Sequence, residues 1–344
     1  MSATSDTISS ISALLSLSDS QYLIYDIGRR VDNISKEQFE EIETAHLPYP
    51  YPIQGHALLA IAFWQTQASS PYLWFVKLPL DEQGLLNQGA RNHFIAIIIE
   101  ALGENLSVDP TEQQEALLKK NPYHFTPAQY KLASVNSLIS STLEQSASKF
   151  YLAAQKYLSG IEGWNAWQEV GVQGLSDFAF RLNEDDNDKI LSHALACLPE
   201  QVLTPLCSAL ENVILSTHNI EKIILRYQQE KTANNTVKIA LMRALASSTQ
   251  HPVCLNFLTQ LIASESVNEE TLIIIAGRLW PVLSSEDNLF NFLEHLVRDN
   301  DHALFLAIFK DLVAIPTIRP VLLQAIRSPK RSTNLAQAIG MLFK

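Results

Sequence analysis

The sequence predicts an α+β amino-terminal domain followed by an all-α, HEAT-like stack of short helices, a protein that is predominantly helical overall. Runs rich in β-branched and aromatic residues are found in the first hundred residues, whereas beyond residue 188 apolar residues recur at helical spacing almost without interruption. The expected organisation is an α+β domain with a small sheet (1–105), a connector (104–125) and a helical domain (126–344), with HEAT-like helix pairs from about 187 to 344.

The amino-terminal elements follow from local patterns. In chain order we expect an amphipathic helix (7–17), a strand (21–34), an acidic turn or short helix (36–43), an extended Pro-Tyr segment (47–52), two strands (57–65 and 72–78) and a helix ended by Gly103 (85–103). In the last of these strands Tyr72 and Trp74 share one face while Leu73 and Phe75 share the other. Two apolar faces predict a position in the middle of a covered sheet.

The connector and the helical half are marked by start and stop signals. Asp109-Pro110-Thr111-Glu112 and Thr126-Pro127-Ala128-Gln129 both read as helix starts, and Asn121-Pro122 breaks the chain between them. The glycine-rich stretch 160–174 is expected to be a joint between two helical bodies. Beyond it the apolar stripes predict helices over 190–197, 201–214, 220–227, 237–246, 253–262, 269–282, 287–297, 302–313, 319–326 and 334–342. Because their spacing holds no fixed period, a closed helical bundle is the competing architecture.

Composition excludes several classes of protein. The formal net charge of −11 and a pI near 5.3 disfavour nucleic acid as the main partner, since binding phosphates needs a basic surface. Three cysteines, an odd number, cannot form a disulfide scaffold, so a reducing compartment is expected. The amino terminus lacks the charged flank and apolar core of a signal peptide, and no apolar run is long enough to span a membrane. We therefore expect a cytoplasmic protein with no membrane partner, whereas homo-oligomerisation stays open.

Three motifs in the first hundred residues suggest a family. Tyr25-Asp26-Ile27-Gly28-Arg29-Arg30, Pro48-Tyr49-Pro50-Tyr51-Pro52 and the run from Trp74 to Gly84, followed by Arg91, together resemble a bacterial family known as domain of unknown function 3549. The likeness covers most of the chain. It implies no activity, ligand or catalytic residue.

The most suggestive group for chemistry lies at the strand-to-helix turn 79–93. Asp81 and Glu82 end the strand there, and Arg91 and His93 lie on the following helix, so carboxylate, guanidinium and imidazole could perform acid and base catalysis together. The structural alternative is that Asp81 or Glu82 caps the helix and pairs with Arg91. The structural alternative carries the greater weight.

Metal and phosphate sites find little support. His193 lies one helical turn from Cys197, but zinc needs three or four ligands, and Cys207 and Cys254 do not form a close pair. The acidic run 184–188 lacks the glycine and distal glutamate of a calcium loop and is better placed at a helix amino terminus. No phosphate loop, nucleophile elbow or His-Glu-x-x-His motif occurs. We expect no metal and no cofactor.

Two aromatic pairs are candidates for binding a protein partner. Tyr49 and Tyr51 stand in a stiff, extended segment that could dock in a partner groove, although packing against the domain's own sheet is the favoured alternative. Trp164 and Trp167 could be an exposed anchor pair or could fill the joint at 160–174.

The leading hypothesis is a non-catalytic cytoplasmic adaptor that binds a protein partner on its helical-repeat surface. The alternative is an enzyme or small-ligand sensor with a pocket at the turn 79–93. A third hypothesis, an RNA-binding helical repeat, needs basic residues along one concave face, and the local supply is Lys222, Arg226, Lys231, Lys238 and Arg243.

Overall fold

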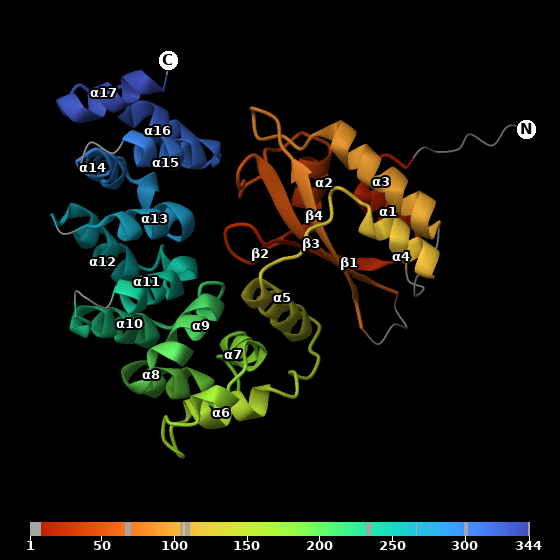
Figure 1. The fold of residues 1–344 in the computed structure, drawn as a ribbon, viewed down its shortest axis with the longest axis horizontal. Helices are drawn as coiled ribbons and strands as arrows, with labels where there is room; N and C mark the ends of the chain where they lie inside the picture. The colour runs from red at the N-terminus through yellow and green to blue at the C-terminus, as the bar shows by residue number, and fades with distance from the viewer. Residues whose placement is uncertain are drawn as a thin grey trace, which may run out of the picture. The chain divides into compact units, whose positions relative to one another are not determined.

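The computed structural model describes residues 8–65, 70–103, 106, 111–231, 235–265, 267–298 and 302–342. The chain divides into two compact units, unit 1 (Met1–Pro127) and unit 2 (Ala128–Lys344). Over the described residues it contains 17 α-helices and one four-stranded sheet, which lies in unit 1 (Figure 1). The predicted fold class, an α+β domain followed by helices, is therefore confirmed.

Unit 1 is built on an antiparallel sheet with the strand order β2-β1-β3-β4. Its strands are β1 (Gln21–Asp26), β2 (Asp32–Ile34), β3 (His56–Trp64) and β4 (Tyr72–Pro79), and its helices are α1 (Ile11–Leu17), α2 (Lys36–Glu43), α3 (Gln88–Leu102) and α4 (Glu112–Lys119). The single strand expected over 21–34 is a hairpin, because the chain turns at Gly28. Alternate residues of β3, Leu59 and Ile61 among them, enter a core that also contains Phe39 and Phe94 from α2 and α3.

The expectation that the strand at 72–78 lies in the middle of the sheet is wrong, because β4 is an edge strand. Its outer edge is instead covered by the segment that follows α4. The amide of Lys77 donates to the carbonyl of Tyr123 (2.7 Å), and the amide of Phe125 donates to that of Phe75 (3.3 Å). Residues 123–125 of the expected connector thus belong to unit 1, where they pair with backbone groups on the outer edge of β4.

Helix boundaries follow the capping residues only in part. Thr111 forms a capping box with Gln114 at the start of α4, while Asp109 and Pro110 of the predicted start lie outside the described residues. The second predicted start has no such device, since Ala128 precedes α5 (Gln129–Thr142) without a side-chain cap. Gly103 ends α3 with a φ of 67°, as the sequence predicts.

The Pro-Tyr segment is held inside unit 1 by a buried polar network. The hydroxyl of Tyr49 donates to Asp26 Oδ1 (2.5 Å), and Arg29 Nη2 donates to the carbonyl of Pro52 (3.0 Å). All three side chains are buried. A Cβ on Gly28 would stand 3.2 Å from Asp26 Oδ1, so glycine lets the chain pass close to this carboxylate.

Unit 2 consists of helices that stack in two layers (Figure 1). Besides α5 they are α6 (Tyr151–Leu158), α7 (Val172–Ala179), α8 (Asn187–Cys197), α9 (Glu200–Leu210), α10 (Thr217–Gln229), α11 (Asn235–Ala244), α12 (Pro252–Ala263), α13 (Glu269–Arg278), α14 (Glu286–Leu296), α15 (His302–Ala314), α16 (Arg319–Ala325) and α17 (Thr333–Met341). Each odd-numbered helix from α5 packs on the next odd-numbered one, and the even-numbered helices pack on one another in the same way. Within unit 2, Figure 1 shows α9, α11, α13 and α15 along one side of the array and α8, α10, α12 and α14 along the other.

All ten helices predicted beyond residue 188 are present. Stacking nevertheless begins earlier than the expected residue 187, because α5 and α7 already belong to the odd-numbered layer. In the stretch 160–174, expected to be a joint between two bodies, residues 160–171 form a loop between α6 and α7, residues 172–174 begin α7, and the two helices contact each other. The loop carries a 3₁₀ turn at Trp167–Glu169.

Tyr49→Phe is expected to destabilise unit 1 by about 1.5–3 kcal/mol, because it removes a buried hydrogen bond to a carboxylate. The measurement is the opening free energy of the β1 and β3 amides from native-state hydrogen exchange. Tyr123→Phe is the control, since it removes an exposed hydrogen bond to His93 and should cost less than about 0.5 kcal/mol. If the two substitutions had equal effects, the buried hydrogen bond from Tyr49 to Asp26 would not stabilise unit 1 as we infer.

Candidate functional site

The turn before α3 uses its polar residues to fold itself. Asp81 Oδ1 accepts the amides of Gln83 and Leu85, both at 2.9 Å, and Gly84 takes a φ of 85°. Asn87 caps α3 by accepting the amide of Ala90 (2.9 Å). The interpretation that Asp81 or Glu82 caps this helix is therefore wrong.

Arg91 is buried and joins α3 to the end of α2. It donates to the backbone carbonyl of Glu43 and to Asn92 Oδ1 (2.8 and 3.1 Å). The Glu43 carboxylate accepts the amides of Ile11 (2.7 Å) and Ser12 (3.2 Å) at the start of α1. Burial raises the pKa of Glu43, an effect that these bonds and the charge of Arg91 only partly oppose, and burial lowers the pKa of Arg91. Both side chains therefore act as structural ties between helices.

His93 is exposed and also has a local partner. Its Nδ1 lies 3.1 Å from the hydroxyl of Tyr123, and the two rings meet edge to face. Asp81, Arg91 and His93 thus each contact a different group, while Glu82 is exposed at the tip of the turn. The four candidate catalytic residues do not converge on one point.

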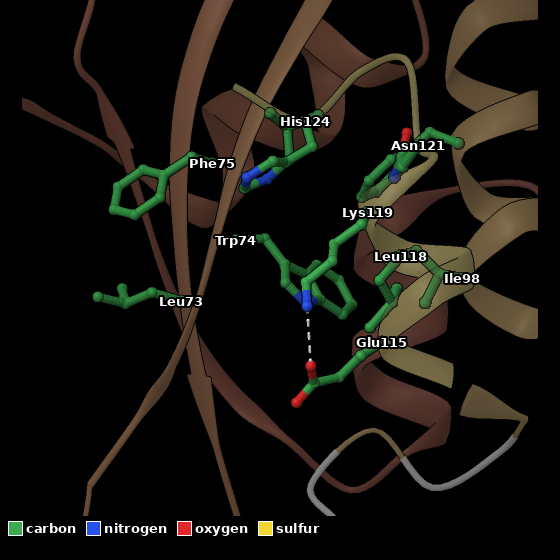
Figure 2. A pocket seen from close by; sticks show the side chains of 11 residues that line it. Leu73, Trp74, Phe75, Ile98, Glu115, Leu118, Lys119, Asn121 and His124 are labelled. Atoms are coloured by element: carbon green, nitrogen blue, oxygen red, sulfur yellow. Dashed lines mark hydrogen bonds and ion pairs between the residues drawn. The ribbon is translucent and has the colours of Figure 1, made fainter. Parts of the chain in front are cut away.

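A pocket of about 240 Å³ lies further along α3 (Figure 2). Phe94 and Ile98 of α3 face Trp74 of β4 across it, and Leu118 of α4 closes one side. No residue of 79–93 lines it. Glu115 and Lys119, an exposed ion pair at 3.1 Å, and His124 supply its ionisable groups. These walls suit a small apolar ligand better than acid or base catalysis.

The Pro-Tyr segment does not present its tyrosines for recognition. Tyr49 is completely buried, so the hypothesis that it is exposed to a partner is wrong. Tyr51 is half-buried against the core, and its pKa is raised to about 12, first by burial and then by the negative charge of Asp32. The alternative interpretation, packing against the unit's own sheet, holds for both.

The two tryptophans of the loop 160–171 lie in different surroundings. Trp164 packs edge to face on Tyr157 and covers Gly160, where a Cβ would come within 2.6 Å of its ring. Gly160 has a φ of 71°, so both its backbone and its neighbour exclude a side chain. Trp164 therefore fills the loop, while Trp167 is exposed on the 3₁₀ turn.

The strongest polar cluster of unit 2 centres on Glu211, directly after α9. Its fully buried carboxylate accepts two bonds from Arg243 (Nε at 2.5 Å and Nη2 at 2.9 Å) and one from Arg278 Nε (3.1 Å). Lys131 Nζ of α5 lies 3.6 Å away. The guanidinium of Arg243 also lies over the ring of Tyr130. One carboxylate therefore joins α5, α9, α11 and α13.

The charges of this cluster determine its ionisation. Burial acts to raise the pKa of Glu211, but the hydrogen bonds from Arg243 and the charges of Lys131, Arg243 and Arg278 outweigh it, so the pKa is lowered. The carboxylate is ionised at neutral pH. Guanidinium groups stay charged in proteins, so the cluster keeps an excess of positive charge.

The faces of α9, α11 and α13 beside this cluster form a groove of about 490 Å³, here called the array groove. Its walls are mainly apolar, and Arg243 and Arg278 stand in the last turns of α11 and α13. The full lining is Thr204, Ser208, Thr236, Ile239, Ala240, Arg243, Glu270, Ile273, Ile274, Gly277 and Arg278. This combination of an apolar groove and fixed charge is a candidate binding site of unit 2.

The basic residues of the RNA-binding hypothesis do not share one face. Arg226 of α10 pairs with Glu230 (2.6 Å) and donates to the carbonyl of Ala196 (2.7 Å), in the even-numbered layer. Arg243 belongs to the odd-numbered layer and is bound to Glu211. The row of positive charge that this hypothesis requires is not formed by these two residues.

Candidate metal ligands remain dispersed among the described residues, where no group of three or more His, Cys, Asp or Glu side chains could hold an ion. Cys197 is exposed, whereas Cys207 and Cys254 are buried, and burial raises the pKa of each of these two thiols to about 12. Of the acidic run 184–188, Asp186 pairs with Lys189 (2.6 Å) and Asp188 accepts from Asn219 (2.7 Å). Over the same residues, no helix combines the length and hydropathy that crossing a membrane requires.

Glu211→Gln is expected to destabilise unit 2 by about 3–5 kcal/mol, because it leaves three cationic groups without their shared carboxylate. Hydrogen exchange of the α9 and α11 amides measures this free energy. Glu200→Gln, an exposed change on α9, is the control and should stay within about 0.5 kcal/mol of wild type.

The same pair of proteins predicts a pH dependence. Because folding lowers the pKa of Glu211 below its ordinary value of 4.5, its contribution is present above about pH 4.5 and is lost as the pH falls through the folded pKa. The stability difference between wild type and Glu211→Gln should therefore be constant near neutral pH and shrink below about pH 4.5. If this stability difference grew as the pH falls, the conclusion that Glu211 is ionised in the folded protein would be wrong.

Comparison with known proteins adds one result. No curated protein and no solved structure matches the chain. The family model described as "Protein of unknown function (DUF3549)" matches residues 6–343, nearly the whole length, and agrees with the resemblance carried by the motifs of unit 1. The chain therefore belongs to the DUF3549 family.

Proposed function

We propose that this protein is a non-catalytic, cytoplasmic protein–protein interaction scaffold that binds a partner on a HEAT-like helical-repeat surface. Stacked short helices offer extended curved faces, and such faces commonly bind other proteins. The three free cysteines support a reducing compartment. The lack of convergence among Asp81, Glu82, Arg91 and His93 weighs against catalysis at the turn 79–93.

The observation that carries the proposal is the array groove. Ile273 is 48% exposed in its wall, beside the half-buried Ile239 and Ile274. A Cβ on Gly277 would meet nothing within 4 Å, so this helix leaves open space in the groove. Glycine inside a helix costs up to about 1 kcal/mol relative to alanine, and at this position it also keeps the groove clear.

An open groove along several helices favours a protein segment as its occupant. Small-molecule pockets usually enclose most of the ligand surface, whereas grooves on helical arrays accept helices or extended segments through apolar anchors. The groove spans α11 and α13 from their first turns, at Thr236 and Glu270, to their last turns. Eight residues of helix between Glu270 and Arg278 correspond to about 12 Å, or roughly two helical turns of a partner.

Gly277→Leu tests the proposal, because a Cβ at this position would meet nothing within 4 Å, the rest of the side chain would occupy the array groove, and leucine is a better helix former than glycine. The tagged full chain is used to capture proteins from native cells. A stoichiometric partner should be retained by wild type and reduced at least about tenfold by Gly277→Leu, the loss expected when an anchor side chain is excluded.

Gly340→Leu is the matched control, since Gly340 is an exposed helical glycine of α17 that also has open space around its Cβ. It should capture the partner as wild type does. Capture that is equally strong with Gly277→Leu, or no stoichiometric partner with wild type, would contradict the proposal.

A small-ligand sensor is the second candidate, favoured by the aromatic pocket between β4, α3 and α4. Phenol or indole should raise the melting temperature of the wild-type chain at about millimolar concentration, as expected for ligands of so few atoms. Leu118→Trp would fill the pocket and abolish the shift, whereas Leu117→Trp, whose neighbouring position does not line the pocket, would preserve it. An absent shift, or one that survives Leu118→Trp, would exclude this pocket as the sensor site.

A further inference from the structure

The basic end of the array groove has donors that the fold does not use. Arg278 gives its Nε to Glu211 (3.1 Å) and its Nη1 to the carbonyl of Gly277 (2.9 Å), and its Nη2 has no hydrogen-bond partner among the described residues. The side chain is 21% exposed and lines the groove. Arg243, bound to Glu211 through Nε and Nη2, lines it as well and is 19% exposed.

The charge balance at this end favours an anion. Arg243 and Arg278 both pair with the Glu211 carboxylate, so two guanidinium charges meet one negative charge there. The carbonyl ends of α11 and α13 oppose this by roughly half a charge each, but that effect is confined to the last turn and is weakened by screening. Arg278 already donates a hydrogen bond to one of these carbonyls, that of Gly277.

A neutral polar group in the groove also lacks a partner. Thr204 Oγ1 of α9 is buried and makes no hydrogen bond within the described chain, although Thr204 lines the groove. A buried hydroxyl without a partner is destabilising, and a ligand oxygen or a bridging water would relieve this cost. Glu270 stands at the opposite end of the groove, so the two ends differ in charge.

We infer that the array groove binds a carboxylate carried on an apolar segment of a partner protein, with the carboxylate at Arg243 and Arg278 and the apolar part against Ile239 and Ile273. The inference deepens the proposed function and rests on it. A monoanion fits better than a phosphate dianion, because the Glu211 carboxylate lies directly behind both guanidinium groups and would repel the second charge.

The inference is tested by comparing the binding of an apolar carboxylate with that of the neutral amide of the same shape. Octanoate and octanamide, used as the probes, differ only in the charged group, and saturation-transfer NMR on the full chain reports their binding. Wild type should bind octanoate about tenfold more tightly than octanamide, because a hydrogen bond to a charged group contributes more binding free energy than one to a neutral group. Arg278→Gln should remove this preference, because it removes Arg278 Nη2, the group that we infer donates to the carboxylate.

Two further variants separate the possible causes. Lys238→Gln removes one positive charge from α11 at a residue that stands over the ring of Tyr227 and does not line the groove, so it should keep the preference. Gly277→Leu should abolish the binding of both probes. Failure of octanoate to bind wild type, or a preference that survives Arg278→Gln, would overturn the inference.

The captured partner distinguishes this inference from the proposed function. If Gly277→Leu abolishes capture while Arg278→Gln leaves it unchanged, the scaffold stands and the carboxylate site fails. If capture does not depend on Gly277 at all, the scaffold itself fails. A free apolar acid that co-purifies with wild type, but not with Arg278→Gln, would replace the protein segment by a small molecule and overturn the identity of the occupant.

Discussion

The buried carboxylate of Glu211 is the constraint on which unit 2 depends most. It receives Arg243 and Arg278 directly and has Lys131 nearby, so a single charge connects four helices of the odd-numbered layer. Burying such a group adds little net stability, because desolvation cancels much of the Coulomb attraction. Its effect is on geometry, since any slippage of α11 or α13 along the stack would leave a buried charge without its partner.

This constraint also shapes the surface that we propose to be functional. The arginines that hold Glu211 cannot turn away from it, so their remaining N–H groups are held at the end of the array groove. Fixed donors bind a ligand at a lower entropic cost than mobile side chains do. Gly277 keeps space beside them, so the same two helices provide both the rigid charge and the room for an occupant.

Local patterns predict local structure here, and long-range contacts account for what they miss. Helix periodicity locates the helices beyond residue 188 because each stripe is set within one or two turns. It does not reveal that β4 is an edge strand, because its cover comes from Tyr123 to Phe125, far along the chain. The role of Glu211 likewise cannot be predicted from the neighbouring sequence, because its partners lie 80 residues before it and up to 67 residues after it. A charge within an apolar stripe is the only local signal, and Lys131 and Glu211 both carry it.

The motifs that identify the family and the residues proposed to bind a ligand are different sets. Asp26, Arg29 and Tyr49, which carry two of the three motifs, are all buried in unit 1, where Tyr49 bonds to Asp26 and Arg29 bonds to the backbone of the same Pro-Tyr segment. Arg91 similarly ties α3 to α2. Sequence motifs made of charged and aromatic residues suggest chemistry, but here burial assigns them to the folding of unit 1. The array groove has no motif because a helical stack builds its binding surface from single residues on separate helices, and only the stacking of α9, α11 and α13 brings them together.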